Sequence, residues 1–270
     1  MPKLIESLQN ERVKRAVKLR DRKGREKQGR IVVDGLREIR LALDSQVDIV
    51  ELFDCDSDSQ ATDIAQIIKI ANERQIECIK VVPRVFDKLS FGQRSCGLVA
   101  IARTPKAKLA EWQCPKSPLI AVLEGVEKPG NLGAVIRSAD GANVSAVFVA
   151  DGRTDIYNPN SIRASVGTVF SMPVFADSAA NIQQWLLENN VAIVTADASG
   201  PREFFDTDLT QPTAIVLGNE AEGLSSIWRD DEVTCVRIPM LGIADSLNVS
   251  TTAGILFYEA LRQRTSAASD

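Results

Sequence analysis

The chain has 270 residues, a formal net charge of −4 and no histidine. Without histidine, Ser-His-Asp catalysis and His-based metal sites are excluded, so any chemistry must use Arg, Lys, Asp, Glu, Ser, Asn or backbone groups. No run approaches the roughly 20 apolar residues of a membrane span, and the N-terminus lacks the apolar stretch of a signal peptide, so we expect a cytoplasmic protein.

The chain opens with a strongly basic segment. A helix is expected over residues 6–23, and residues 12–30 hold ten basic residues against Asp21 and Glu26, a local charge of +8. Such a segment favours a polyanion partner, whereas the alternative is an ordinary solvated helix face. We expect phosphate contacts with RNA here, from Arg15, Lys18, Arg22 and Arg25.

Short strands and helices alternate through the rest of the first hundred residues. We expect strands at 30–33, 49–53, 77–82 and 97–103, and helices at 36–43, 62–74 and 85–89. This alternation predicts a small α/β domain over residues 1–103. Pro105 and Pro115 mark residues 104–117 as a linker, with a short helix near Leu109.

The second half repeats the alternation and predicts an α/β domain with a mostly parallel sheet over residues 118–270. Strands are expected at 119–123, 146–149, 191–196, 214–217 and 234–238. Helices are expected at 131–142, with Asn131 as N-cap, at 182–188 and at 246–264. The five cysteines form no close pair, which argues against a zinc site and a disulfide framework.

Three short polar islands stand where apolar stretches end in this second domain. Gly130 and Gly133 flank Asn131 at the start of a helix, and the segment is either a phosphate cradle or a tight turn. Glu220 follows a strand, where α/β proteins bind ligands, although a turn would explain it too. Ser246 opens the last helix, where it or Asp245 could simply be a cap.

Together these islands resemble the SpoU (TrmH-like) family of RNA ribose 2′-O-methyltransferases, within the SPOUT superfamily. The resemblance spans about residues 118–264, and its three motifs match Asn131 and Arg137, then Gly218 and Glu220, then Ile238-Pro239 with Ser246-Leu247-Asn248. The first domain is similar, more weakly, to the small ribosomal-protein-like α/β domain that many members carry for RNA. Ala221 and Asn143 depart from the family at places where glycine is common.

The resemblance implies a deep trefoil knot in the second domain, an exception to the rule that chains do not thread loops. It implies S-adenosylmethionine bound by the knot loops, and a homodimer whose active site is completed across the interface. The residues implied to line the cofactor site are Leu217, Gly218, Ile238, Met240 and Leu247. Arg153, Arg163 and Ser165 are implied to lie near RNA, where Tyr157 would suit a splayed-out base.

The family assigns the general-base role to the arginine that corresponds to Arg137. Because guanidinium is effectively always protonated, Arg137 either takes the 2′-hydroxyl proton with help from a phosphate or stays cationic and stabilises the developing alkoxide. Glu220 and Asn131 would orient it, Ser246 and Asn248 would fix the loops, and no metal is required.

The expected function is methylation of a ribose 2′-hydroxyl in structured RNA. Ribosomal RNA is the first choice and transfer RNA the second, and an antibiotic-resistance methylase remains an open alternative. A non-catalytic RNA-binding member of the knotted family is the rival from another class. A base methyltransferase of a related knotted family is disfavoured by Ser246-Leu247-Asn248.

Overall fold

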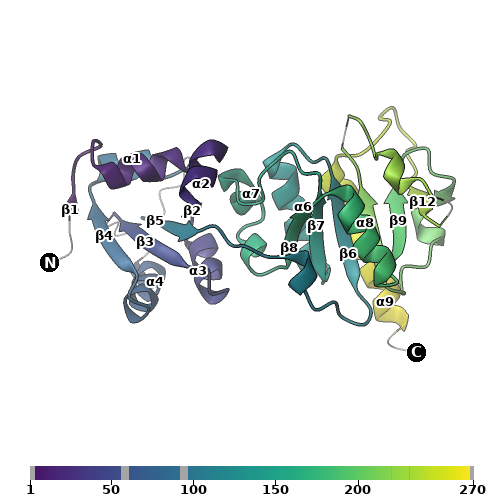
Figure 1. Ribbon diagram of the computed structural model, residues 1–270, viewed down its shortest axis with the longest axis horizontal. Helices are drawn as coiled ribbons and strands as arrows, with labels where there is room; N and C mark the ends of the chain where they lie inside the picture. The colour runs from purple at the N-terminus through teal and green to yellow at the C-terminus, as the bar shows by residue number, and fades with distance from the viewer. Residues whose placement is uncertain (1–3, 56–60, 92–96, 220, 231, 268–270) are drawn as a thin grey trace. The chain divides into compact units, whose positions relative to one another are not determined.

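The computed structural model describes residues 4–55, 61–91, 97–219, 221–230 and 232–267 (Figure 1). They form two compact units: the first unit contains residues up to 106 and residues 157–171, and the second unit contains 107–156 and 172 onward. No helix among the described residues is both long enough and apolar enough to cross a bilayer. The cytoplasmic location stays a prediction.

The first unit contains a five-stranded sheet in the order β1-β4-β3-β5-β2. The strands are β1 (Leu4–Ile5), β2 (Arg30–Asp34), β3 (Ile49–Asp54), β4 (Glu77–Val81) and β5 (Leu98–Arg103). The helices are α1 (Glu11–Lys18), α2 (Arg22–Gln28), α3 (Leu36–Asp44), α4 (Ala61–Glu73) and α5 (Pro83–Leu89). β5 runs antiparallel to β2 and β3, whereas β4 is parallel to β1 and β3. The small α/β domain expected here is therefore a mixed sheet with helices.

The single basic helix expected over residues 6–23 is wrong, because α1 ends at Lys18 and a second helix, α2, begins at Arg22. Gly24 explains the crossing of the two helices. A Cβ at this position would lie 1.8 Å from the backbone oxygen of Lys18, so only glycine allows α2 to pass this close. Arg25 secures the break, since its guanidinium donates hydrogen bonds of 2.8 Å and 2.7 Å to the carbonyls of Leu19 and Arg20.

Residues 157–171 pack in the first unit, although the sequence suggested that they belong to the second domain. They form α7 (Pro159–Ala164) and the 3-10 turn η3 (Thr168–Phe170), which pack against β2 and α3 respectively. Gly167 joins them with a φ of +88°, and a Cβ there would lie 3.0 Å from the Cα of Glu38. A glycine is required at this close approach.

The second unit is built on a seven-stranded sheet in the order β10-β12-β9-β11-β6-β7-β8. Its strands are β6 (Leu119–Glu124), β7 (Ala146–Ala150), β8 (Val174–Asp177), β9 (Ala192–Ala196), β10 (Arg202–Glu203), β11 (Thr213–Leu217) and β12 (Thr234–Arg237). Every pairing between these strands is parallel. The expected parallel sheet is confirmed, and its two edge strands, β8 and β10, are additions.

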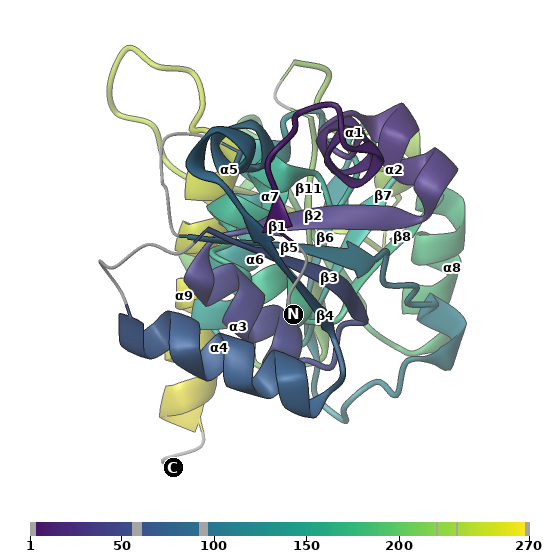
Figure 2. The same cartoon turned by 90° about the vertical axis from the view of Figure 1, so that its left-hand side faces the viewer.

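Helices cover both faces of this sheet. α6 (Pro129–Gly141) packs against α9 (Val249–Ala267), and α8 (Ala179–Glu188) lies on the opposite side of the sheet (Figure 2). The central strands β6, β7 and β11 are buried along their whole length, which is why they read as continuous apolar runs. On the α8 face, Trp112 from the linker packs edge-on against Phe148, with ring centroids 5.7 Å apart, and beside Trp185 at 5.5 Å.

The expected cap at Asn131 is wrong, and the open alternative of a cap at Asp245 or Ser246 does not hold either. α6 begins at Pro129 with Lys128 as its N-cap residue, so Asn131 lies inside the first turn. α9 begins at Val249, and the side-chain oxygen of Asn248, rather than Asp245 or Ser246, accepts the backbone N–H of Ser250 at 2.9 Å. Asn143, which departs from the family glycine, has a φ of 55°, a conformation that asparagine tolerates. The trefoil knot stays a prediction of the resemblance.

Candidate active site

Four parallel strands of the second unit end at the same edge of the sheet. Leu217, the last residue of β11, pairs with Leu123 of β6 and with Ala196 of β9, and Ala196 pairs in turn with Val236 of β12. The loops that follow these strands therefore emerge side by side. Ligands of open α/β sheets bind in the crevice beyond the carboxyl ends of the strands.

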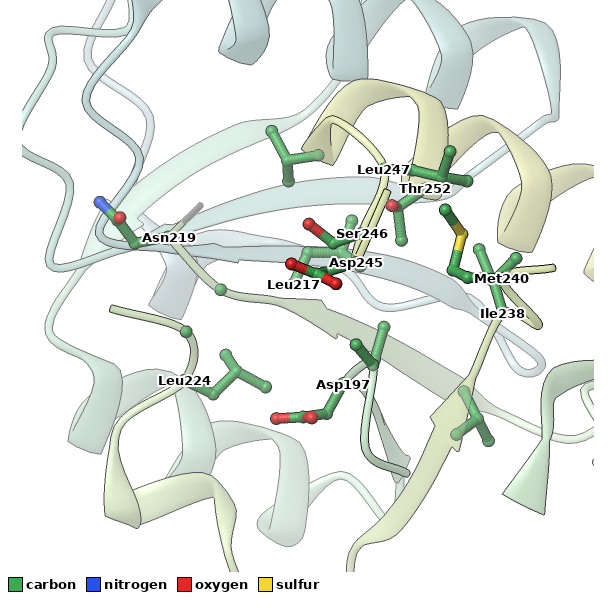
Figure 3. Close-up of a pocket in the computed structure, with 16 residues that line it drawn as sticks. Asp197, Leu217, Asn219, Leu224, Ile238, Met240, Asp245, Ser246, Leu247 and Thr252 are labelled. Atoms are coloured by element: carbon green, nitrogen blue, oxygen red, sulfur yellow. The ribbon is translucent and has the colours of Figure 1, made fainter. Parts of the chain in front are cut away.

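A cavity of about 250 Å³ lies among three of these loops and the start of α9 (Figure 3). All five residues expected to line a cofactor site are in its wall: Leu217, Gly218, Ile238, Met240 and Leu247. Ser246 is also in the wall. Val236, Leu224, Val249 and Thr252 complete much of the remaining surface. The wall is therefore mostly apolar, with backbone groups and a few polar side chains.

Gly218 sets the shape of the cavity's central loop. A Cβ at this position would lie 2.5 Å from the carbonyl carbon of Gly223 and 2.7 Å from the amide nitrogen of Leu224. Both contacts are with backbone, so the loop folds back on itself only because residue 218 has no side chain. The return is closed by a 2.9 Å hydrogen bond from the Gly223 N–H to the Asn219 carbonyl.

Two side chains tie this loop to the end of β6. Asn219 donates its side-chain amide to the carbonyl of Gly125 at 2.9 Å, and its side-chain oxygen accepts the N–H of Ala221 at 2.8 Å. Glu124 is buried, and its carboxylate accepts the N–H of Ser225 at 2.8 Å and the Ser225 hydroxyl at 2.7 Å. Charge-assisted bonds of this kind make the loop geometry stiff.

Asp197 lines the cavity from the end of β9. Its Oδ1 accepts the Ser199 hydroxyl at 2.6 Å and the Ser199 N–H at 2.8 Å. These two hydrogen bonds lower the pKa of Asp197, and the charge of Arg229 adds to the effect, while partial burial opposes it. The cavity therefore contains a carboxylate that is ionised at neutral pH.

The structure brings together parts of the first and third sequence islands. The Asn248 side-chain amide lies 3.5 Å from the side-chain oxygen of Asn131, across 117 residues of sequence. Asn131 also lines a smaller hollow that shares Gly218, Asn219 and Val249 with the main cavity. Three expected catalytic residues, Asn131, Ser246 and Asn248, thus lie in or beside one site.

The other two expected catalytic residues are placed differently. Arg137 is exposed, six residues along α6 from Asn131, and it does not contribute to the described wall of the cavity. Glu220 lies outside the described residues. Its neighbours Asn219 and Ala221 both line the hollow beside Asn131.

The residues expected to contact RNA fall into two groups. Arg15, Lys18 and Arg22 are exposed, and Arg22 forms a 2.7 Å ion pair with Glu26 one turn away. Arg25 and Ser165 are 3% and 0% exposed. The Arg25 guanidinium donates hydrogen bonds to backbone carbonyls, and the Ser165 hydroxyl donates to the carbonyl of Ile162 at 2.9 Å. Neither side chain is available at the surface, so neither can make the RNA contact expected of it.

Arg153 and Arg163 also have protein partners. Arg153, in the second unit, is exposed and bridges Glu127 at 2.5 Å and Glu222 at 2.7 Å, and these hydrogen bonds raise its pKa. Arg163, in the first unit, donates to the carbonyl of Phe91 and lies 5.9 Å from the centre of the Phe91 ring. Tyr157 stacks on Phe170 with their planes 10° apart.

Sequence reasoning missed Asp197, Asn219 and Glu124 as parts of the site. Each stands at or just after the end of a buried strand of the second unit. The same rule that drew attention to Glu220 after β11 applies to Asp197 after β9. Had it been used for every expected strand, it would have found all three residues.

Family models match both halves of the chain. The SpoU rRNA Methylase family model matches residues 118–258, and the MRM3-like substrate binding domain model matches residues 10–100. The fold and site define a methyltransferase with the SPOUT architecture and a separate substrate-binding domain. The chain belongs to the SpoU rRNA Methylase family, which confirms the resemblance noted in its motifs.

One similar protein and two solved structures each cover nearly the whole chain. The 23S rRNA (uridine(2479)-2′-O)-methyltransferase of Streptomyces viridochromogenes is 32% identical over 92% of this chain and 88% of its own length. A solved RNA 2′-O ribose methyltransferase is 38% identical, with a TM-score of 0.84 over 97% of this chain and 99% of its own. The SpoU methyltransferase AviRb of Streptomyces viridochromogenes, solved in complex with the cofactor AdoMet, is 29% identical, with a TM-score of 0.85 over 96% of this chain and 99% of its own.

Proposed function

We propose that this protein transfers a methyl group from S-adenosylmethionine to a ribose 2′-hydroxyl in ribosomal RNA. The observation that carries the proposal is the cavity at the ends of β9, β11 and β12. Its wall contains all five expected cofactor residues, and the contact between Asn131 and Asn248 adjoins it. The names of the relatives support 23S ribosomal RNA as the substrate.

The cavity fits the chemistry of S-adenosylmethionine. Leu217, Leu224 and Leu247 offer apolar surface for the adenosine, and the Asp197 carboxylate suits a positively charged ligand. Gly218 and Gly223 line the cavity and have no side chains, so they present backbone groups that could bind the base edge. The cofactor would supply a methyl group on a sulfonium, which needs only in-line positioning of the ribose oxygen.

Arg137 is the residue we propose to act on the 2′-hydroxyl. As a permanently charged group, it would stabilise the developing alkoxide, with the proton lost to a substrate phosphate or to water. The alternative, in which Arg137 itself takes the proton with the help of a phosphate, stays open. Asn131, Asn248 and Ser246 would position the ribose and the loops, and Glu220 would orient Arg137.

A homodimer would explain why Arg137 is exposed and absent from the described wall of the cavity. We propose that Arg137 of one subunit completes the cavity of its partner. The loop after β12 also supports a contact with a second subunit, since Leu241 and Ile243 are 99% and 102% exposed. Exposed apolar side chains of this size favour burial against another surface.

For the first unit, we propose that Arg15, Lys18 and Arg22 bind RNA phosphates. All three are exposed on α1 and at the start of α2, and the match to a substrate-binding domain supports this assignment. Phosphate contacts of this type give affinity that falls with salt but carries little sequence information. The nucleotide that is modified must therefore be selected elsewhere.

Methylation is tested by mapping 2′-O-methyl groups in RNA from cells with and without the gene, followed by transfer assays with the purified protein. Loss of one ribosomal RNA site, restored by the wild-type protein, is expected. A lost site in transfer RNA would replace the substrate, and no lost site would favour a non-catalytic RNA-binding protein. Cofactor binding by Arg137→Ala should be normal while transfer is lost, and normal transfer by this variant would refute the role of Arg137.

The shared active site is tested by mixing Arg137→Ala, which should lose transfer, with Gly218→Ala, which should bind the cofactor weakly. The assay uses S-adenosylmethionine at a concentration far below the dissociation constant of Gly218→Ala, so that each variant alone is close to inactive. If Arg137 acts on the partner's cavity, a mixed dimer has one site with both wild-type groups. Random reassociation of equal amounts makes about half of the dimers mixed, so about a quarter of wild-type activity returns. A tagged pull-down verifies that the subunits have exchanged. If they have exchanged and no activity is recovered, Arg137 serves its own subunit.

A further inference from the structure

The charged side chains in the described wall of the cofactor cavity are both acidic. They are Asp197, at the end of β9, and Asp245, in the loop before α9. No lysine or arginine is among the described residues of the wall. Figure 3 shows the Asp197 carboxylate directed into the open space beside Leu224, with the Asp245–Ser246 segment across from it.

Asp197 is held in this position by its own turn. Ser199 donates hydrogen bonds of 2.6 Å and 2.8 Å to Oδ1 of Asp197 and none to its other carboxylate oxygen. The turn is fixed further where Gly200 packs against the backbone of Val236. A Cβ at residue 200 would lie 2.6 Å from the Val236 carbonyl carbon, so this approach also requires glycine. The hydrogen bonds from Ser199 lower the pKa of Asp197, which keeps the carboxylate charged.

We propose that Asp197 is a specificity-determining residue that makes the cavity favour the cationic methyl donor over its uncharged thioether product. This inference rests on the proposed function. Methyl transfer breaks the sulfur–methyl bond, forms the oxygen–methyl bond and releases the hydroxyl proton, so the sulfur loses its positive charge. A carboxylate in the wall attracts the sulfonium and has no such attraction for the thioether. Product release is thereby favoured after each turnover.

The magnitude follows from Coulomb attraction across a small cavity. A sulfonium about 6 Å from the carboxylate would form a partly solvated pair of unit charges, which changes affinity by about three- to ten-fold. Arg229 is near enough to lower the pKa of Asp197, yet its side chain is exposed and outside the described wall. It reduces the attraction without cancelling it.

The test measures dissociation constants by calorimetry for three ligands of similar shape. S-adenosylmethionine and sinefungin, an analogue with an amine near the place of the methyl-sulfonium, are both cationic at this position, whereas S-adenosylhomocysteine is the neutral thioether. In Asp197→Asn, the first two should bind about three- to ten-fold more weakly. Binding of S-adenosylhomocysteine should change by less than about two-fold.

Asp208→Asn is the matched control. Asp208 has the same local arrangement on the surface of the second unit, since its Oδ1 accepts the N–H of Thr210 at 2.9 Å and the Thr210 hydroxyl at 2.6 Å. The substitution changes the same charge and the same type of turn, but Asp208 does not contribute to the described wall of the cavity. All three dissociation constants should equal those of the wild type, and thermal unfolding checks that both variants fold.

Two results would overturn the inference. If Asp197→Asn weakens all three ligands equally, the carboxylate serves only the shape of the turn or a part of the ligand common to all three. If none of the three constants changes, the carboxylate does not act on the sulfonium. In both cases wild-type binding of S-adenosylmethionine would still support the proposed function, whereas failure of the wild type to bind any of the three would contradict the function itself.

Discussion

Replacing Gly218 by alanine tests whether the folded-back loop shapes the cofactor cavity. The new Cβ would lie 2.5 Å from the Gly223 carbonyl carbon and 2.6 Å from its oxygen, whereas ordinary contact begins at 3.4 Å. The loop must therefore move by about 1 Å or carry the strain, and overpacking of this kind costs about 1–3 kcal/mol. We expect this cost to be divided between a lower free energy of unfolding and weaker binding of S-adenosylmethionine.

The assay combines calorimetry of cofactor binding with urea unfolding of the same preparation. If the whole cost falls on binding, the dissociation constant rises by about 5- to 150-fold. Gly130→Ala is the control, because a Cβ at this exposed position in the first turn of α6 meets nothing within 4 Å. It should be neutral or raise stability by up to about 1 kcal/mol. The reasoning is refuted if Gly218→Ala matches this control in both measurements.

Three further predictions concern hydrogen bonds elsewhere in the two units. Arg25→Met should lower the free energy of unfolding by about 2–4 kcal/mol, because two backbone carbonyls lose a charged donor. Arg15→Met is the control: it should change the free energy of unfolding by less than about 0.5 kcal/mol and should weaken RNA binding. Glu124→Gln should cost about 1–2 kcal/mol in urea unfolding through the weakened bonds to Ser225, and an unchanged midpoint would contradict that role. Hydrogen bonds from Thr210 lower the pKa of Asp208 in the folded chain, so its stabilisation is complete above the unfolded pKa of about 3.9 and is lost as the pH falls through the folded value. Acid unfolding of Asp208→Asn should be less steep below about pH 4 than that of the wild type, and identical curves would argue against this contribution.

Most of the second unit's strands could be predicted, since strands covered on both faces read as short apolar runs. Helix ends were harder. Asn131 and Ser246 both looked like caps, yet α6 begins two residues before Asn131 and α9 begins three residues after Ser246. Local propensity allows several cap positions, and the packing of α6 against α9 selects among them.

The basic segment shows the same limit at the level of single side chains. Arg15 and Arg25 look alike in the sequence, but Arg15 is exposed and Arg25 is 3% exposed. The difference arises because Gly24 lets α2 fold against the end of α1, which turns Arg25 inward toward the carbonyls of Leu19 and Arg20. A charge count cannot distinguish a solvated arginine from one that satisfies backbone acceptors.

By itself, the sequence determined the alternation of strands and helices, the absence of histidine chemistry and the order of three motifs. These are properties of residues close together in the chain, where periodicity and spacing act directly. Tertiary structure alone decided that Asn131 meets Asn248 and that residues 157–171 pack in the first unit. Such placements depend on strand order and on the burial of distant apolar faces against one another, which no local pattern encodes.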